Sequence, residues 1–318
     1  MALGRRVTII DVGSDLPADL SHAADALAKS TPTDWAPAAR DAYCASNRDA
    51  RHGLARFGSE HAVRPMQDII DRPPADISLR SSQALGGLSN LWGAAVLPLH
   101  PQDIAQWPVT APDLAPHFKA VSDFMPIAGA PGGLSSAFQL SDLTFSAPLP
   151  ESRQGSRLVQ SLARIKDDNL VAGPAWQGAA AGCTSCGLCL YGCPYRLIFS
   201  SAAPIRDLGA SEQVTYVKGE VQAIAEAGDG VEIVLAGRSD PLVADKVFVA
   251  AGVLETARIL FASRPEIAAN GLTLRESRHF FTPFLASGRA GRPDKEPHHT
   301  MVQAFVELTA PDISPWLI

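Results

Sequence analysis

Short apolar runs separated by turn residues predict a mixed α/β protein. Residues 7–10 are apolar except for Thr8 and end at Asp11, which is typical of a strand buried in a parallel sheet. Further runs rich in β-branched residues predict a strand meander with a turn at residues 228–230; these runs are residues 214–217, 221–225, 231–235 and 246–250. Alternation over residues 302–308 predicts one more strand.

Helical and irregular segments lie between these strands. Helical composition or periodicity is found in residues 21–30, 108–124 and 254–262. The second of these helices is expected to begin at Thr110 or Asp113, because both side chains can cap a helix. Residues 2–4 are typical of the end of a helix that stops at a glycine. The Pro-, Gly- and Ser-rich residues 127–154 predict a long surface connection, and residues 287–297 predict a polar loop.

The composition narrows the class of protein. The chain has 318 residues, 46% of them hydrophobic and 19% charged, so it can bury a sizeable core and has room for two domains. The net charge is −6 and no basic block stands out, which argues against nucleic acid as a partner. No apolar run reaches the roughly 18 residues of a membrane span. The first residues do not form a signal peptide, so a cytoplasmic location is expected.

The cysteines form the most specific pattern in the chain. There are five; Cys44 stands alone, and the others follow the spacing C-x2-C-x2-C-x3-C-P at Cys183, Cys186, Cys189 and Cys193. This is the spacing of a bacterial ferredoxin cluster run, and Gly187 and Gly192 allow the loop to wrap. A single cluster needs Cys193 or Cys44 as its fourth ligand, or else is a three-iron cluster. A metal-free loop stays an alternative, and zinc is a weaker one because zinc ribbons separate their C-x2-C pairs.

An acid and a glycine pair suggest nucleotide binding. Asp11, at the end of a buried strand, is placed as in a dinucleotide-binding βαβ unit, where the carboxylate binds the adenosine ribose. An ordinary acid closing a strand fits the same pattern. Gly86 and Gly87 permit close backbone approach to a ligand, although a tight turn without a ligand fits them as well.

Several segments in this order resemble the glucose–methanol–choline (GMC) family of FAD-dependent oxidoreductases. The loop is similar to the Gly-Gly-x-Ser-x-x-x-Gly segment that lies along the flavin in that family; it comprises Gly86, Gly87, Leu88, Ser89, Asn90, Leu91, Trp92 and Gly93. Residues 103–108 and 113–118 resemble the D-F-x-x-W-P and D-L-x-P-Y-Y stretches that follow it in bacterial members. The cysteine loop also resembles a C-x-x-C-G-x-C-x-x-G-C-P loop in one bacterial branch.

A second flavin-contacting segment continues the resemblance. Residues 247–260 are similar to the family's V-x-x-A-A-G strand–turn–helix, in which Ala250, Ala251 and Gly252 let the diphosphate approach a helix start. Val221 matches the position whose backbone contacts adenine. The resemblance extends from Val7 to about Ser263 and then fades.

The resemblance implies a fold and an activity. The expected fold is α/β (α+β): an incomplete FAD/NAD(P)-binding Rossmann-like domain with a β-meander, plus part of a substrate-binding domain. The FAD-binding domain is expected at residues 1–100 and 200–275, and the substrate domain, with the cysteine loop 183–194, at residues 101–199 and 276–318. The implied reaction is oxidation of a CH–OH group of an alcohol or sugar-like substrate by hydride transfer to the flavin. The cysteine loop adds a [4Fe-4S] or [3Fe-4S] cluster as a further expected cofactor. The expected partners are the substrate and an electron-acceptor protein.

Both ends of the family pattern are missing from the sequence. No G-x-G-x-x-G unit precedes residue 7, and no segment matches the family's catalytic histidines, so no catalytic residue is assigned. The absent first strand occupies the middle of the family's sheet, which predicts a chain that folds poorly or binds FAD weakly. The competing hypotheses are an iron–sulfur electron-transfer module and an inactive gene remnant.

Overall fold

The computed structural model describes residues 4–45, 60–64, 79–101, 104–138, 140, 142–274, 282–284, 292 and 295–308. The chain divides into two compact units. The first comprises Met1–Ser21, Gly58–Leu91 and Ser200–Glu276, and the second comprises His22–Phe57, Trp92–Phe199 and Ser277–Ile318. The units contain small sheets, one of which is parallel and two antiparallel among the described residues. The assignment of each predicted domain to FAD or to substrate stays a prediction, because the units are defined by packing alone.

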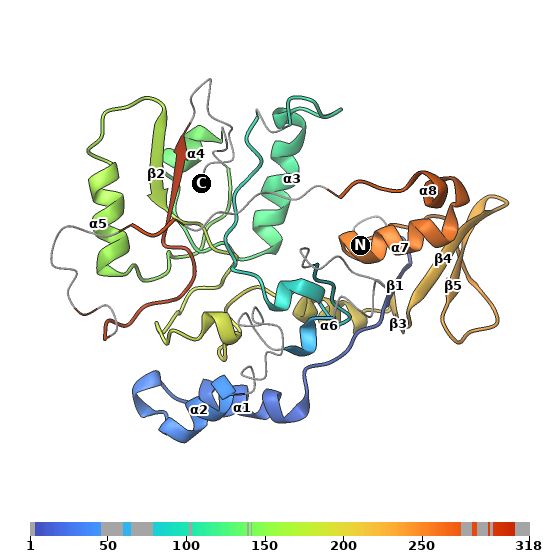
Figure 1. Ribbon diagram of the computed structural model, residues 1–318, viewed down its shortest axis with the longest axis horizontal. Coiled ribbons are helices and arrows are strands. Elements are labelled where there is room, and N and C mark those ends of the chain that lie inside the picture. Colours follow the sequence, from blue (N-terminus) through green and yellow to red (C-terminus); the bar gives the residue numbers. More distant parts are fainter. Residues whose placement is uncertain are drawn as a thin grey trace. The chain divides into compact units, whose positions relative to one another are not determined.

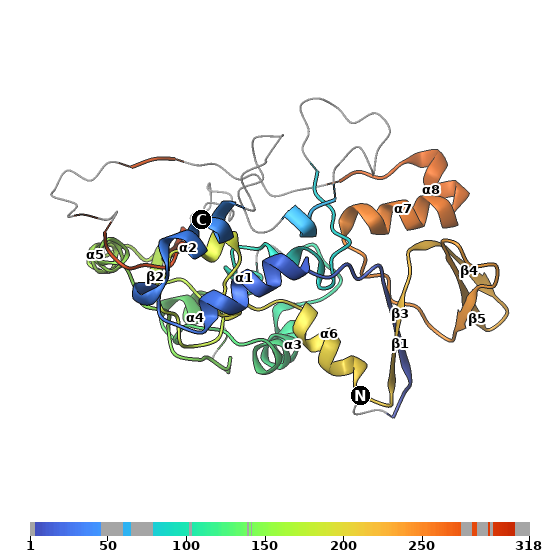
Figure 2. The same cartoon turned by 90° about the horizontal axis from the view of Figure 1, so that it is seen from below.

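The first unit contains a parallel pair of strands and a separate antiparallel meander. Strand β1 (Val7–Asp11) runs beside β3 (Val214–Lys218), with Asp11 opposite Lys218 (Figure 2). The meander consists of β4 (Val221–Ala227), β5 (Gly230–Leu235) and β6 (Leu242–Ala244). Helix α7 (Val253–Ser263) packs against β4 (Figure 1) and is followed by α8 (Pro265–Asn270), while α6 (Ala202–Gly209) precedes β3.

The predicted strands of this unit are confirmed with one exception. Residues 7–10, 214–217, 221–225 and 231–235 all lie in strands, and the helix predicted at residues 254–262 is α7. The strand predicted at residues 246–250 is wrong, because no strand forms there and β6 lies earlier, at Leu242–Ala244. The apolar run fits a strand by composition, but β6 already occupies the edge of β5, and Phe248 is 90% exposed.

The second unit combines helices with a two-stranded antiparallel sheet. Strand β2 (Leu170–Pro174) pairs with β7 (Ala304–Leu308), which confirms the strand predicted at residues 302–308. Its helices are most of α1 (Ala18–Ala28), α2 (Pro37–Ala45), α3 (Ala111–Phe124), α4 (Gly133–Ala137) and α5 (Arg153–Leu162). Short 3-10 turns are found at Pro32–Asp34 and Cys189–Tyr191 in this unit, and at Glu60–Ala62 and Gly87–Asn90 in the first.

The predicted helices form, but some of their ends differ from the predicted residues. The segment predicted at residues 21–30 is α1, which begins earlier, and α3 starts after the N-cap Thr110, as predicted. The Asp113 carboxylate accepts hydrogen bonds from the backbone N–H and hydroxyl of Thr110, at 2.8 and 2.6 Å, and this fixes the start of the helix.

The predicted surface connection at residues 127–154 is wrong in part. It contains helix α4, and apolar side chains from this segment pack on Trp176, which is 2% exposed; they are Ile127, Leu134 and Phe138. The proline and glycine content predicts turns correctly, but it does not report how much of a loop is buried. Residues 2–3, Asp103 and most of residues 287–297 lie outside the described residues.

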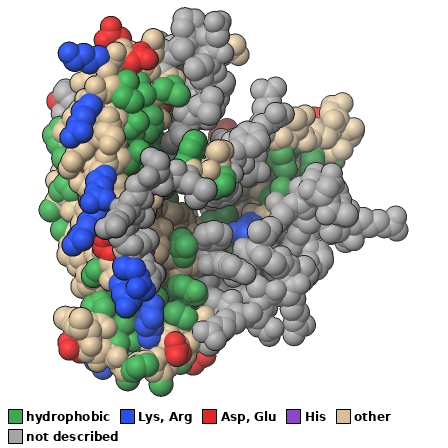
Figure 3. Space-filling model, turned by 60° about the vertical axis from the view of Figure 1, so that its left-hand side comes forward, with side chains coloured by type: hydrophobic (Ala, Val, Ile, Leu, Met, Phe, Trp, Pro, Cys, Tyr) green, Lys and Arg blue, Asp and Glu red, His purple; other side chains and the backbone are tan. Residues whose placement is uncertain are grey.

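Large hydrophobic side chains remain at the surface of both units. Phe248 and Val253 of the first unit are 90% and 71% exposed, and Phe124 of the second is 62% exposed. On the face drawn in Figure 3, hydrophobic side chains reach the surface in several places between Lys and Arg side chains. None of the described helices has the length and apolar character needed to cross a lipid bilayer.

Candidate functional site

Asp11 lies at the carboxyl end of the parallel pair β1–β3. Its Oδ1 accepts a hydrogen bond from the backbone N–H of Gly13 at 3.2 Å. Burial raises the pKa of Asp11 above its ordinary value, although hydrogen bonds from the Gly13 and Val12 N–H groups and the charge of Lys218 oppose the rise. Gly13 has φ +60°, and a Cβ there would lie 2.0 Å from the hydroxyl of Tyr216. The turn after Asp11 therefore requires glycine, for its backbone conformation and for space.

The glycine loop begins beside this same strand end. The backbone N–H of Ser14 donates to the carbonyl of Gln83 at 2.9 Å, and the N–H of Leu85 donates to the carbonyl of Ser14 at 2.9 Å. These bonds form a parallel bridge between Ser14 and Ala84. The structure thus brings two residues predicted to bind a nucleotide, Asp11 and Gly86, to the carboxyl end of the parallel pair.

The side chains of Ser89 and Asn90 hold the glycine loop in shape. The Ser89 hydroxyl donates to the carbonyl of Gly86 and lies 2.9 Å from the hydroxyl of Ser201. Asn90 donates to the carbonyls of Leu85 and Gly87, at 2.9 and 2.8 Å, and accepts from the Ser200 hydroxyl at 2.8 Å. Sequence reasoning missed Ser200 and Ser201, although a serine pair directly before a helix is a usual capping signal.

Replacing Asn90 by alanine is expected to destabilise the protein by about 1–3 kcal/mol, because two part-buried carbonyls lose their donor. Thermal or urea unfolding followed by circular dichroism measures this change. Asn270→Ala is the matched control, since the Asn270 amide makes one exposed hydrogen bond, to the carbonyl of Glu266. Equal effects of the two substitutions would contradict the role given to Asn90.

The predicted strand–turn–helix segment borders a pocket of its own. An open pocket of about 500 Å³ lies at the start of α7, with a largely apolar lining formed by Ala250, Gly252, Val253, Thr256, Ala257, Leu260, Leu272, Thr273 and Leu274. Gly252 has φ +83°, and nothing lies within 4 Å of the position that a Cβ would occupy. The described lining includes Ala250 and Gly252 but neither Ala251 nor the glycine loop.

An ion-pair network around the buried Glu255 connects the start of α7 with the segment before the glycine loop. Glu255, in the first turn of α7, accepts hydrogen bonds from Arg64 at 2.9 Å, Ser81 at 3.0 Å and Arg258 at 2.7 Å. Arg258 also donates to the carbonyl of Val221 at 2.8 Å. The carbonyl of Val221, whose backbone is predicted to contact adenine, therefore already accepts one hydrogen bond within the protein. No sequence motif indicated this network, because Arg64 and Glu255 are 191 residues apart in the chain.

Trp92 and Gly93, the end of the predicted flavin loop, belong to the second unit. The indole N–H of Trp92 donates to the carbonyl of Phe199 at 2.8 Å. A Cβ on Gly178 would lie 2.6 Å from the Trp92 ring, so the indole packs directly on backbone. This contact gives Trp92 a packing role in its own unit.

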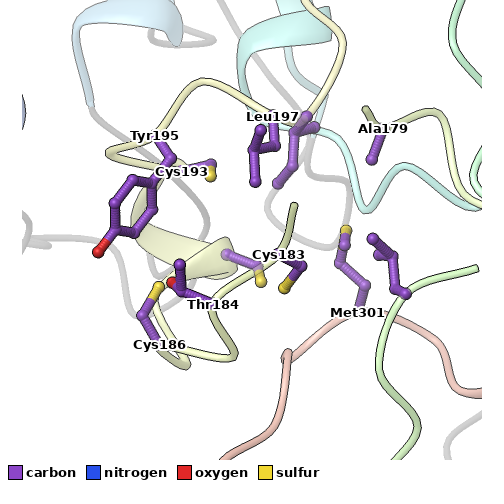
Figure 4. Close-up of a pocket in the computed structure, with 11 residues that line it drawn as sticks. Ala179, Cys183, Thr184, Cys186, Cys193, Tyr195, Leu197 and Met301 are labelled. Carbon is purple, nitrogen blue, oxygen red and sulfur yellow. The ribbon is translucent and has the colours of Figure 1, made fainter. Parts of the chain in front are cut away.

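The four clustered cysteines line one small cavity in the second unit (Figure 4). The cavity measures about 20 Å³, roughly the space of one water molecule. Apart from the cysteines and Thr184, the wall is apolar or aromatic and is formed by Leu149, Ala179, Tyr195, Leu197, Ile198 and Met301. All four thiols are free, and Gly187 and Gly192 have φ +74° and +88° where the loop wraps.

Burial favours the protonated form of three of these thiols, and backbone N–H groups offer hydrogen bonds to their sulfurs. Burial raises the pKa of Cys183 and Cys193, and raises that of Cys186 to about 11. Backbone N–H groups nevertheless face the sulfurs, from Ser185 at 3.4 Å for Cys183 and from Tyr195 and Leu197 for Cys193. Within the described ranges, no three His, Cys, Asp or Glu side chains lie close enough to hold one metal ion.

Helices α1 and α2 pack against the cysteine loop. The Tyr43 hydroxyl donates to the carbonyl of Gly192 at 2.7 Å, and the Tyr195 hydroxyl donates to the carbonyl of Ser30 at 2.8 Å. Trp35 stacks on Tyr195 with ring centroids 6.1 Å apart. Cys44 joins the hydrophobic cluster around Leu188, which also includes Cys186. Sequence reasoning missed these aromatic contacts, for which the chain gives no local signal.

Comparisons with known proteins leave the chain without an assigned family. No protein-family model matches it, and no curated protein matches it. The functional hypotheses therefore rest on the residues described above.

Proposed function

We propose that this protein is an FAD-dependent oxidoreductase of the GMC type that oxidises a CH–OH group of an alcohol or sugar-like substrate. The supporting observation is that Asp11 and the Gly86–Gly87 loop lie at the carboxyl end of the parallel pair β1–β3. In open α/β sheets, ligands bind at the carboxyl ends of parallel strands. This placement supports the proposal, because a Rossmann-like domain binds its dinucleotide at that end of the strands.

The residues of the first unit suit different parts of FAD. Asp11 would bind the adenosine ribose through its carboxylate, and its partial burial strengthens such a hydrogen bond. Gly87 and Gly252, at which a Cβ would meet open space, would let the diphosphate or the ring system approach the backbone. The Val221 backbone would contact adenine next to Arg258, whose side chain already donates one hydrogen bond to the Val221 carbonyl. Bound FAD supplies the hydride acceptor, and no residue of this chain is assigned as the catalytic base.

Asp11→Asn is expected to weaken FAD binding about 10- to 100-fold, because a charge-assisted hydrogen bond is worth about 1.5–3 kcal/mol. Titration of the purified chain with FAD, followed by quenching of flavin fluorescence, measures the affinity, which the sequence predicts to be weak. Asp15→Asn is the matched control, since the Asp15 carboxylate is exposed and paired with Arg206 and Lys218. Failure of the unaltered chain to bind FAD, or unchanged affinity of Asp11→Asn, would exclude this site.

The redox reaction itself is tested on the flavin-loaded protein. Under anaerobic conditions, an alcohol or sugar substrate should bleach the flavin absorbance as FAD is reduced. A panel of primary alcohols, secondary alcohols and aldoses would identify the substrate class. Bound flavin that no member of the panel bleaches would argue against CH–OH oxidation.

A second candidate function is electron transfer through an iron–sulfur cluster. The observation that favours it is the convergence of four free thiols on one cavity with a largely apolar wall. The donor set fits a cluster, since thiolates are its usual ligands and N–H groups already face the sulfurs of Cys183 and Cys193. The cavity must widen to admit a cluster, because it now holds about one water molecule. Absorbance separates the two functions: flavin gives two structured bands, and a cluster gives broad brown absorbance.

A further inference from the structure

The sequence leaves open whether Cys193 or Cys44 is the fourth ligand of a cluster, and the structure favours one of them. In ferredoxins with two clusters, the last cysteine of such a run binds the other cluster. Here Cys193 lines the same cavity as the three cysteines before it. Gly192, with φ +88°, turns the chain before Cys193, and Pro194 directly after it is fully buried. The last cysteine is therefore held at the same cavity as the other three.

Cys44 has a different position. It lies on α2 and packs in the cluster around Leu188, and it is absent from the described lining of the cavity. The neighbouring Tyr43 is the α2 residue that hydrogen-bonds to the loop, through the carbonyl of Gly192. Helix α2 thus contacts the loop beside the thiols without contributing a thiol to the cavity.

We infer that the loop supplies the complete ligand set of a single four-iron cluster, formed by Cys183, Cys186, Cys189 and Cys193, and that Cys44 is not a ligand. This inference rests on the second candidate function, because it presupposes that the loop binds a cluster. The lining of the cavity supports it, since all four loop cysteines border the same space and Cys44 is not among its described lining residues.

Anaerobic reconstitution of the full chain with ferrous iron and sulfide tests the ligand set. We expect about four iron atoms per chain in the unaltered protein and in Cys44→Ser. Cys193→Ser should retain about three irons, with the paramagnetic resonance signal of an oxidised three-iron cluster, or lose most of its iron. Full iron content in Cys193→Ser together with iron loss in Cys44→Ser would overturn the inference, as would three irons in the unaltered chain.

A labelling measurement on the unaltered chain avoids variants that fail to fold. Iodoacetamide modification, mapped by peptide mass spectrometry, is compared between the iron-loaded and iron-free protein. We expect loading to protect the four loop cysteines and to leave the rate at Cys44 unchanged. Protection of Cys44 with continued labelling of Cys193 would overturn the inference. Absence of iron uptake by the unaltered chain would overturn both the inference and the electron-transfer function, without bearing on FAD binding.

Discussion

Glu255→Gln is expected to lower the free energy of unfolding by about 3 kcal/mol, the largest effect of any single polar substitution proposed for this chain. The Glu255 side chain is 9% exposed, and its carboxylate bonds to Arg64, Ser81 and Arg258. Glutamine retains the shape but removes the negative charge. Arg64, whose side chain is 18% exposed, and Arg258 then lose the charge of a carboxylate that lies 2.9 and 2.7 Å from them. A buried charge that loses its close counter-ion is costly because water cannot replace it.

Urea unfolding followed by circular dichroism measures this loss, and Glu226→Gln is the matched control. Glu226 also pairs with an arginine, Arg264, but its side chain is 75% exposed. An exposed ion pair contributes about 0–1 kcal/mol, so the control should change little. Similar effects of the two substitutions would show that burial does not govern the contribution of the Glu255 network.

The pH dependence of stability gives an independent measure of the same network. Burial alone would raise the pKa of Glu255, but hydrogen bonds from Arg258 and Ser81 and the charges of Arg64 and Arg258 outweigh it, so its pKa lies below the ordinary value. The carboxylate therefore stabilises the fold fully above the unfolded-state pKa, and this contribution is lost as the pH falls through the folded-state pKa. Glu255→Gln should show a shallower loss of stability on acidification than the unaltered chain.

Local signals in the sequence predicted local structure well. The β-branched runs at residues 7–10 and 231–235 form strands, and the side chains of Thr110 and Asp113 set the start of α3. These predictions succeed because strand propensity and helix capping depend on neighbouring residues. The apolar run at residues 246–250 failed because a strand also needs a hydrogen-bonding neighbour, and composition does not report one.

In the candidate sites, too, the sequence predicted contacts between nearby residues but not contacts between residues far apart in the chain. The spacing of Cys183 and Cys193 predicted that they lie together, since a short loop with glycines limits their separation. The contacts of Ser89 with Ser201 and of Arg64 with Glu255 join residues more than a hundred positions apart. A single sequence contains no periodicity or spacing that reports such pairs, so both networks became visible only in the structure.

Gly86→Ala is expected to destabilise the protein by about 2–4 kcal/mol, through backbone strain and a steric clash acting together. Gly86 has φ +85°, a conformation that costs a residue with a Cβ about 1–2 kcal/mol. Its Cβ would also lie 2.5 Å from the backbone nitrogen of Ala202, at the start of α6. Backbone cannot rotate away as a flexible side chain can, so the loop and α6 must separate, which also strains the bond between Ser89 and Ser201.

Gly87→Ala isolates the contribution of that clash. Gly87 also has a positive φ, +58°, but nothing lies within 4 Å of the position of its Cβ. Its substitution should therefore cost only the conformational strain, about 1–2 kcal/mol, so that Gly86→Ala is the more destabilising by about 1–2 kcal/mol in urea unfolding. Equal losses would mean that the loop does not pack on α6 as described. If the open space beside Gly87 receives part of FAD, Gly87→Ala should in addition weaken FAD binding under conditions where the variant remains folded, because the new methyl group occupies that space.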